Sequence, residues 1–209
     1  MKSNSFLFDK IIKNKRTIFL YKENILPEKL LKNLKVWLDN KKFKDGYHIN
    51  GNEIPRKQLW YEENGNYFCK DWKYRYERWE SQDYESELRF IQNYIQDYVN
   101  NILDFKDIQI PKINSCLINK YRDGNDSIKP HNDTTASFGE YPTIVNLSIG
   151  GPREFVIHEK KKDNKFSINL KNNSLLIMAG GSQKFFQHEI PKNDSKLIRY
   201  SLTFREHLG

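Results

Sequence analysis

The sequence predicts an α+β protein in which two helices precede a core of short strands. Two amphipathic helical patterns lie in the first half of the chain, and seven short strand-like runs follow from about residue 113. Turn residues separate these runs, and many short strands at such spacing indicate a sandwich or barrel. We therefore expect a jelly-roll core, that is, a double-stranded β-helix, with two supporting helices.

The helices are expected where apolar residues recur at helical spacing. Pro27 suits the first turn of a helix, and the stripe that follows it is Leu30, Leu31, Leu34, Trp37 and Leu38. A second helix is expected at about 81–103, with the stripe Leu88, Ile91, Ile95, Tyr98 and Ile102. Residues 1–22 are expected to form a short strand or arm.

The strands of the core are bounded by clear turn signals, such as Asp123-Gly124-Asn125 and Gly150-Gly151-Pro152. The expected strands are residues 113–121, 143–149, 154–159, 165–170, 174–178, 185–189 and 197–204. Residues 43–80 differ from this pattern, because they are rich in loops, aromatic rings and basic side chains. Within them Asn64-Gly65 predicts a hairpin turn.

The chain is basic, with 35 Lys and Arg against 27 Asp and Glu and a formal net charge of +8. Such a charge favours a polyanionic partner such as nucleic acid, although a solvated basic surface explains it equally simply. The two cysteines exclude a disulfide scaffold and a zinc ribbon. With no membrane-length apolar run and no secretory signal, we expect an intracellular protein, cytoplasmic or nuclear, and a monomer.

A possible metal site is the most informative feature. His131 and Asp133 are two residues apart and therefore point to the same side of a strand. His188 stands at the end of a late strand, and early and late strands of a jelly roll are neighbours. Taken singly, a surface His–Asp pair and a core histidine are the simpler explanations. Together, two imidazoles and one carboxylate are the ligands of a non-haem Fe(II) oxygenase.

The last strand carries two arginines on one face. Arg199, Ser201, Thr203 and Arg205 alternate with apolar residues. Guanidinium groups inside a barrel need anionic partners, and the carboxylates of a co-substrate such as 2-oxoglutarate would serve. The alternative is the polar, solvent-facing side of an edge strand. Asn119 and Tyr121 share a face earlier in the chain and could donate to the same dicarboxylate.

Four motifs then resemble the AlkB family of DNA and RNA dealkylases, over about residues 50–207. They are Asn119-Lys120-Tyr121 through Pro130-His131-Asn132-Asp133, Leu147-Ser148-Ile149-Gly150 with Arg153-Glu154-Phe155, Gln187-His188-Glu189-Ile190-Pro191, and Arg199-x-Ser201-x-Thr203-Phe204-Arg205. Upstream, Ile54-Pro55-Arg56-Lys57-Gln58 resembles the entry to that family's nucleotide-recognition lid. The resemblance implies three segments of one structural unit. These are an arm and helix (1–42), the lid and second helix (43–112) and the dioxygenase core (113–209).

The resemblance also implies roles for matching residues. His131, Asp133 and His188 would bind Fe(II). Arg199 would hold the distal carboxylate of 2-oxoglutarate, with Asn119, Tyr121 and Ser201 in the same pocket, and Arg205 would lie near the metal-chelating end and the substrate. The implied reaction is oxidative N-demethylation of 1-methyladenine or 3-methylcytosine in DNA or RNA, with O2 as second co-substrate and formaldehyde, succinate and CO2 as products.

Recognition of a flipped base would involve the lid, because such a base stacks between side chains. Phe68 is the first candidate for stacking, followed by Tyr67 and Trp72, while Arg56 and Lys57 could meet phosphates. The alternative is that these rings form the lid's own small core.

Two positions depart from the family pattern. Ser201 stands where asparagine is usual, and Thr135 stands where many of these dealkylases carry an acidic residue that contacts the base. Thr135 therefore favours, mildly, an oxygenase of the same fold that acts on protein or a small molecule. A nucleic-acid-binding module without turnover is the other alternative.

Overall fold

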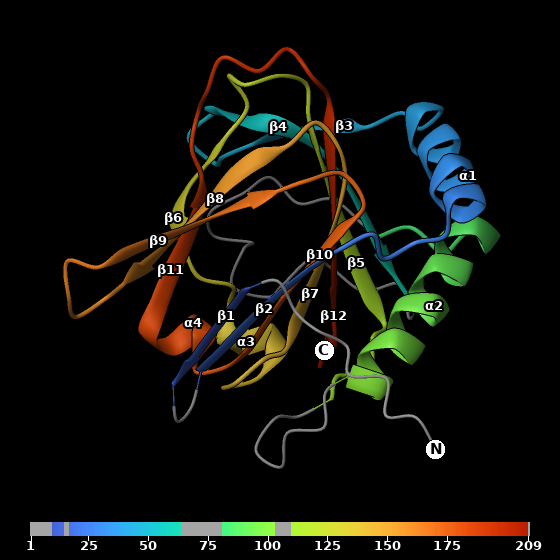
Figure 1. The fold of residues 1–209 in the computed structure, drawn as a ribbon. Helices are drawn as coiled ribbons and strands as arrows, with labels where there is room; N and C mark the ends of the chain where they lie inside the picture. Colours follow the sequence, from blue (N-terminus) through green and yellow to red (C-terminus); the bar gives the residue numbers. More distant parts are fainter. Residues whose placement is uncertain (1–9, 15–16, 64–80, 103–109, 209) are drawn as a thin grey trace.

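The computed structural model describes residues 10–14, 17–63, 81–102 and 110–208. These residues form three layers: a pair of longer helices, an eight-stranded sheet and a four-stranded sheet (Figure 1). The large sheet has the order β1-β2-β10-β7-β12-β5-β4-β3 and the small one β6-β11-β8-β9. Two mainly antiparallel sheets that face each other, covered on one side by helices, are the predicted jelly roll with supporting helices.

The elements have the following bounds. The helices are α1 (Glu28–Asp39), α2 (Ser86–Ile102), α3 (Thr135–Phe138) and α4 (Ser182–Phe185). The strands are β1 (Lys10–Asn14), β2 (Thr17–Glu23), β3 (Lys44–Tyr47), β4 (Glu53–Glu62), β5 (Ser115–Tyr121), β6 (Ile128–His131), β7 (Ile144–Gly150), β8 (Arg153–Glu159), β9 (Lys165–Leu170), β10 (Ser174–Gly180), β11 (Phe186–Ile190) and β12 (Arg199–Arg205). None of the described helices combines the length and apolar character needed to cross a membrane.

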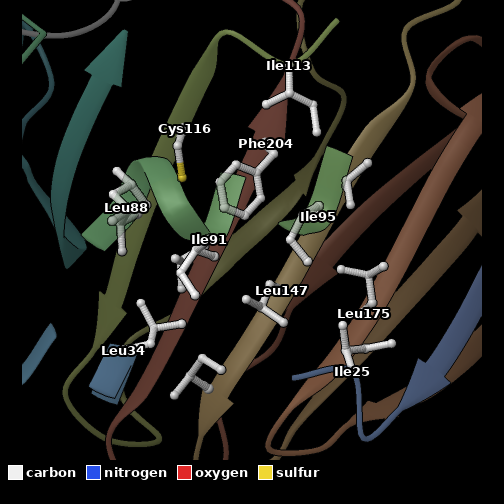
Figure 2. Close-up of a cluster of buried hydrophobic side chains, with 14 of the residues drawn as sticks. Ile25, Leu34, Leu88, Ile91, Ile95, Ile113, Cys116, Leu147, Leu175 and Phe204 are labelled. Carbon is white, nitrogen blue, oxygen red and sulfur yellow. The ribbon is translucent and has the colours of Figure 1, made fainter. Parts of the chain in front are cut away.

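An apolar cluster joins the helices to the large sheet. Leu34 of α1 and Ile91 of α2 pack against Cys116, Leu147 and other strand residues (Figure 2). The predicted stripes of both helices pack against this cluster, although Leu30, Leu31, Tyr98 and Ile102 are only partly buried and α2 also buries Val99. Pro27 is the N-cap of α1. A second cluster, which includes Phe155 and Met178, lies between the two sheets. The strands at the centre of the large sheet are therefore covered on both faces.

Strand β12 shows how this double burial divides the side chains. Tyr200, Leu202 and Phe204 belong to the helix-facing cluster. The alternate residues, Arg199, Ser201, Thr203 and Arg205, line the cavity between the sheets. The predicted division of faces is correct, and the alternative of a solvent-facing edge strand is wrong, because β12 lies between β5 and β7.

Residues 43–63 are more regular than the loop-rich character expected of residues 43–80. Strand β4 is ten residues long and pairs with β5 from Lys57↔Lys120 to Glu62↔Ser115. Its last five residues are all buried, so the alternation that marks a half-exposed strand is missing from the sequence. The described part of this segment is thus an extension of the large sheet, and the turn predicted at Asn64-Gly65 lies outside the described residues.

One boundary and the order of the elements also differ from the prediction. Helix α2 begins at Ser86 and not at about residue 81. Residues before it are tied to β4 instead, since Gln82 N donates to the carbonyl of Trp60 at 2.8 Å and its own carbonyl accepts from Glu62 N at 3.1 Å. The order of helices first and strands second is also too simple, because β2, which precedes both longer helices, joins the large sheet by pairing with β10.

The double role of β12 gives a test of stability. Leu202 is fully buried in the helix-facing cluster, so Leu202→Ala should lower the free energy of unfolding by about 2–5 kcal/mol through lost burial and a residual cavity. Urea denaturation followed by circular dichroism measures this change. The control is Leu197→Ala, at a side chain 58% exposed, which should change the unfolding free energy by less than about 0.5 kcal/mol. Equal effects of both substitutions would contradict the assignment of the core.

Candidate active site

A cavity of about 90 Å³ lies between the two sheets. The large sheet lines it with polar residues of β4, β5, β7 and β12, and the small sheet adds side chains of β6, β8 and β11. The site residues predicted from the core motifs meet here: Asn119, Tyr121, His131, Asp133, His188, Arg199, Ser201 and Arg205 all line this one cavity.

Strand pairing brings the two histidines together. His131 in β6 and His188 in β11 are directly opposite each other in an antiparallel pair, and their ring centroids are 4.3 Å apart. Asp133 follows two residues after His131. One possible ligand atom from each of the three side chains lies within 4.8 Å of the others. This is the only such group of His, Cys, Asp or Glu found among the described residues.

The histidines are held in the form that binds a metal. His131 Nδ1 lies 2.9 Å from the carbonyl of Lys129, so this nitrogen carries the hydrogen and Nε2 remains as a ligand. The ring of His188 is stacked on Phe155 at 5.2 Å. Burial lowers the pKa of His188 to about 3, and the nearby His131 adds to the shift. His188 is therefore neutral at physiological pH, as metal coordination requires.

Asp133 is fixed by an arginine. Arg205 Nε donates to Asp133 Oδ2 at 2.6 Å, and both side chains are at most 5% exposed. Burial alone would raise the pKa of Asp133, but Arg205 and the two histidines together lower it, so the group is a carboxylate. The other oxygen, Oδ1, lies 3.9 Å from His131 Nε2. One carboxylate oxygen is thus held by Arg205 and the other faces the histidines.

Two residues to which the motifs gave no role, Gln183 and Asn132, hold the turn after His131 in place. The side-chain oxygen of Gln183, at the start of α4, accepts from Asp133 N at 3.0 Å. Asn132 Nδ2 donates to the carbonyl of Phe186, in β11. Both contacts fasten the His131–Asp133 segment to the chain just before His188. A buried glutamine in a four-residue helix carries no sequence signal of this role.

Arg199 also lines the cavity and is 1% exposed. Its Nη2 donates to Ser148 Oγ at 2.8 Å, while Nε and Nη1 have no hydrogen-bond partner among the described residues. Burial lowers the pKa of Arg199 to about 10, so the guanidinium still carries its charge at physiological pH. A buried cation with two unsatisfied nitrogens is suited to a carboxylate ligand.

Asn119 and Tyr121 stand beside this arginine on β5. Asn119 Oδ1 accepts from both Arg56 Nε, at 2.9 Å, and Gln58 Nε2, at 2.8 Å. Because its oxygen is engaged by these donors, its amide nitrogen is left as a donor to the cavity. The Tyr121 ring centroid lies 5.1 Å from the Arg199 guanidinium carbon. The predicted co-substrate residues are thus brought together.

Arg153 is a third buried arginine, and it holds two loops. Its guanidinium donates to the carbonyls of Asp123, Asp126 and Pro191 at 2.9, 2.8 and 2.6 Å. The first two lie in the loop before β6, and the third follows β11. The motif match included Arg153 without giving it a role. Its contacts tie together the loops that flank the two histidine-bearing strands.

Of the described residues predicted to contact the substrate, only one lines the cavity. Arg56 lines the cavity, whereas Lys57 points away from it and forms an ion pair with Asp45 at 3.1 Å. Thr135 is exposed at the start of α3 and does not line the cavity. Tyr67, Phe68 and Trp72 lie outside the described residues.

Residues 18–205 match the model of the 2OG-Fe(II) oxygenase superfamily, which is nearly the whole chain. The chain belongs to this superfamily. Membership confirms the predicted class, a dioxygenase that uses Fe(II), 2-oxoglutarate and O2. The site agrees with it, since it offers two neutral imidazoles and a carboxylate to a metal and a buried, unsatisfied guanidinium to an acidic co-substrate.

Curated relatives within this superfamily confirm the resemblance to AlkB. The mouse alkB homolog 3, an alpha-ketoglutarate-dependent dioxygenase, is 39% identical over 102 residues, covering 44% of this chain and 36% of the relative. The Arabidopsis thaliana DNA oxidative demethylase ALKBH2 is 29% identical over 133 residues, covering 51% and 42%. The matches thus span less than half of each relative's length.

Solved structures of the superfamily share the fold. The structure of OsALKBH1 has a TM-score of 0.59 at 13% identity and covers 95% of this chain and 100% of that one. A 2OG-Fe(II) oxygenase from Burkholderia pseudomallei has a TM-score of 0.60 at 12% identity and covers 91% and 85%. At such identity the likeness concerns the arrangement of strands and helices alone.

The metal cluster predicts the effect of removing one ligand. His131→Ala should abolish stoichiometric Fe(II) binding while the fold is kept, because the side chain is 31% exposed and contributes little to the core. Metal content after anaerobic loading, with circular dichroism as the test of folding, measures this. The matched control is His158→Ala, in the same small sheet but paired with Glu189 at 2.7 Å and outside the cluster. Retained Fe(II) in the first variant would refute the assignment.

Gln183 should affect the affinity for Fe(II), although it is not one of the proposed ligands. Gln183→Leu removes the oxygen that holds Asp133 N, so the carboxylate loses a constraint on its position. We expect Fe(II) affinity to fall about 10- to 100-fold, as is usual when a partner of a metal ligand is lost. Competitive titration with a chelator measures the affinity. Gln92→Leu is a control for removing a buried glutamine far from the cluster, since Gln92 bonds to Glu63 and Ile113. An unchanged affinity in the first variant would show that Asp133 needs no such support.

Proposed function

We propose that this protein is an Fe(II)- and 2-oxoglutarate-dependent dioxygenase that oxidatively demethylates N-alkylated bases in DNA or RNA. The observation that carries the proposal is one cavity that holds both a His–Asp–His cluster and, beside it, the unsatisfied guanidinium of Arg199. The curated relative from Arabidopsis thaliana is named a DNA oxidative demethylase, and this supports a methylated nucleobase as the substrate.

The residues would act as follows. His131, Asp133 and His188 would bind Fe(II), and Arg199, with Asn119, Tyr121 and Ser201, would hold the distal carboxylate of 2-oxoglutarate. Fe(II) with this co-substrate and O2 supplies the oxidation of the N-methyl carbon. The methyl carbon leaves as formaldehyde, and 2-oxoglutarate becomes succinate and CO2. Arg205 would keep Asp133 in position near the metal-chelating end and the substrate.

Several cavity residues would exclude water from the reaction. Ile54, Leu117, Phe155 and Met178 line the cavity among its polar groups and are buried. An apolar wall strengthens the attraction between Arg199 and a carboxylate, because both are then shielded from solvent. The protein would orient the reactants and exclude water, while the cofactors would supply the oxidising power.

Nucleic-acid binding would use the described and undescribed parts of the lid. Arg56 at the edge of the cavity and Lys57 on the opposite side of β4 are the described candidates for phosphate contacts, and Thr135 is a candidate for contact with the base. Phe68, Tyr67 and Trp72 remain the candidates for stacking on it. The net charge of +8 favours such a polyanionic substrate.

A single-turnover reaction tests the proposal. The enzyme is loaded anaerobically with Fe(II) and 2-oxoglutarate, mixed with a single-stranded oligonucleotide that carries one 1-methyladenine, and started with O2. We expect the oligonucleotide to become lighter by one CH2 group, as read by mass spectrometry, with an equivalent of succinate. The unmethylated oligonucleotide and His131→Ala serve as controls.

The other outcomes separate the alternatives. Succinate without the loss of mass would reject this base as substrate and support an oxygenase of the same fold that acts on protein or a small molecule. Neither product, with iron bound, would reject turnover and support a nucleic-acid-binding module.

A further inference from the structure

A hydrogen-bonded amide next to Arg199 lines the cavity. Asn146, on β7, is 8% exposed and stands opposite Thr203 of β12 in the sheet. Its Nδ2 donates to Ser201 Oγ at 2.6 Å and to Thr203 Oγ1 at 3.0 Å. Its Oδ1 lies 3.5 Å from Arg199 Nη2 and accepts from Ser148 Oγ at 3.3 Å. The motifs that identify the site do not include Asn146.

The arginine determines which way this amide points. A guanidinium can only donate hydrogen bonds, so the atom of Asn146 that faces Arg199 must be the oxygen. The nitrogen must then face Ser201 and Thr203, and both of its hydrogens are used there. The orientation of the amide therefore follows from the position of one buried charge.

The amide in turn determines which way the two hydroxyl groups point. Each hydroxyl oxygen accepts a hydrogen from Asn146, so each keeps its own single hydrogen for another acceptor. Among the described residues, neither hydroxyl donates that hydrogen to a protein acceptor. Both side chains line the cavity, beside the unsatisfied Nε and Nη1 of Arg199.

We propose that Asn146 is a positioning residue for 2-oxoglutarate, which aims the hydroxyl hydrogens of Ser201 and Thr203 at the distal carboxylate held by Arg199. The inference rests on the proposed function in one respect, that the cavity takes this co-substrate. It explains how Ser201 serves at a position where the resembling family usually has asparagine. Here the amide comes from Asn146 on the neighbouring strand β7. The hydroxyl of Ser201, oriented by that amide, donates to the ligand.

The test is a binding measurement that needs neither turnover nor nucleic acid. Affinity for 2-oxoglutarate is measured by calorimetry with Mn(II) in place of Fe(II), for the wild type and for Asn146→Leu. We expect the dissociation constant to rise at least about tenfold, the size expected when hydrogen bonds to a charged group are lost. Affinity for 2-oxobutyrate, which lacks the distal carboxylate, and for Mn(II) should stay the same. Asn169→Leu, at an exposed position of β9, is the control.

A second variant keeps the test decisive if leucine disturbs the sheet. Asn146→Ser combined with Ser201→Asn moves the amide from β7 to β12, and we expect it to recover most of the affinity that Asn146→Ser alone loses. The inference is overturned if Asn146→Leu binds 2-oxoglutarate like the wild type, if it weakens both oxoacids equally, or if the double variant recovers nothing. Failure of the wild type to bind 2-oxoglutarate would overturn the inference together with the proposed co-substrate. Wild-type binding without demethylation would reject only the proposed substrate.

Discussion

The burial of positive charge inside a small jelly roll is the constraint around which the site is arranged. Arg199, Arg205 and Arg153 are each at most 5% exposed, and a buried guanidinium is costly unless it is paired or hydrogen-bonded. Arg205 is paired with Asp133, and Arg153 donates to three backbone carbonyls. Arg199 lines the cavity and bonds only to neutral side chains among the described residues, and two of its nitrogens have no partner there. The folded protein thus offers a preformed binding position for an anionic ligand.

Strand β12 connects this constraint to the stability of the whole molecule. One face contributes Tyr200, Leu202 and Phe204 to the cluster beneath the helices, and the other carries the two arginines of the cavity. A shift of the strand by one residue would exchange these faces and would place both charges in the apolar cluster. The large apolar contact with α1 and α2 therefore also fixes the register of the charged residues. Stability and chemistry depend on the same pairing.

Much of the fold and the metal cluster could be predicted, because both follow from local patterns. Helix periodicity gave the buried stripes of α1 and α2, and His131, Asp133, His188, Arg199 and Arg205 meet in one cavity as expected. The full length of strand β4 was not predicted, because burial on both faces removes the alternation that marks a strand. The start of α2 was missed because Gln82 pairs with β4, a contact between segments far apart in the sequence.

The supporting residues of the site were missed for a related reason. Gln183 and Asn146 act through bonds to Asp133 N and to the hydroxyls of β12, and such partners are chosen by tertiary packing. An asparagine and a serine on one face of the apolar strand β7 were a signal that some polar group lay opposite. The sequence does not say which one.

The pairing of His131 with His188 has a consequence for how the protein acquires iron. The two side chains come from β6 and β11, whose pairing also requires β8 and the loops fastened by Arg153. In an unfolded chain these segments are far apart, so no high-affinity site exists until the small sheet has closed. Iron cannot organise this chain from the start, as zinc does in a zinc finger. As the proposed metal ligands, these side chains would meet only after the fold has formed, so the apoprotein would have to be stable without iron.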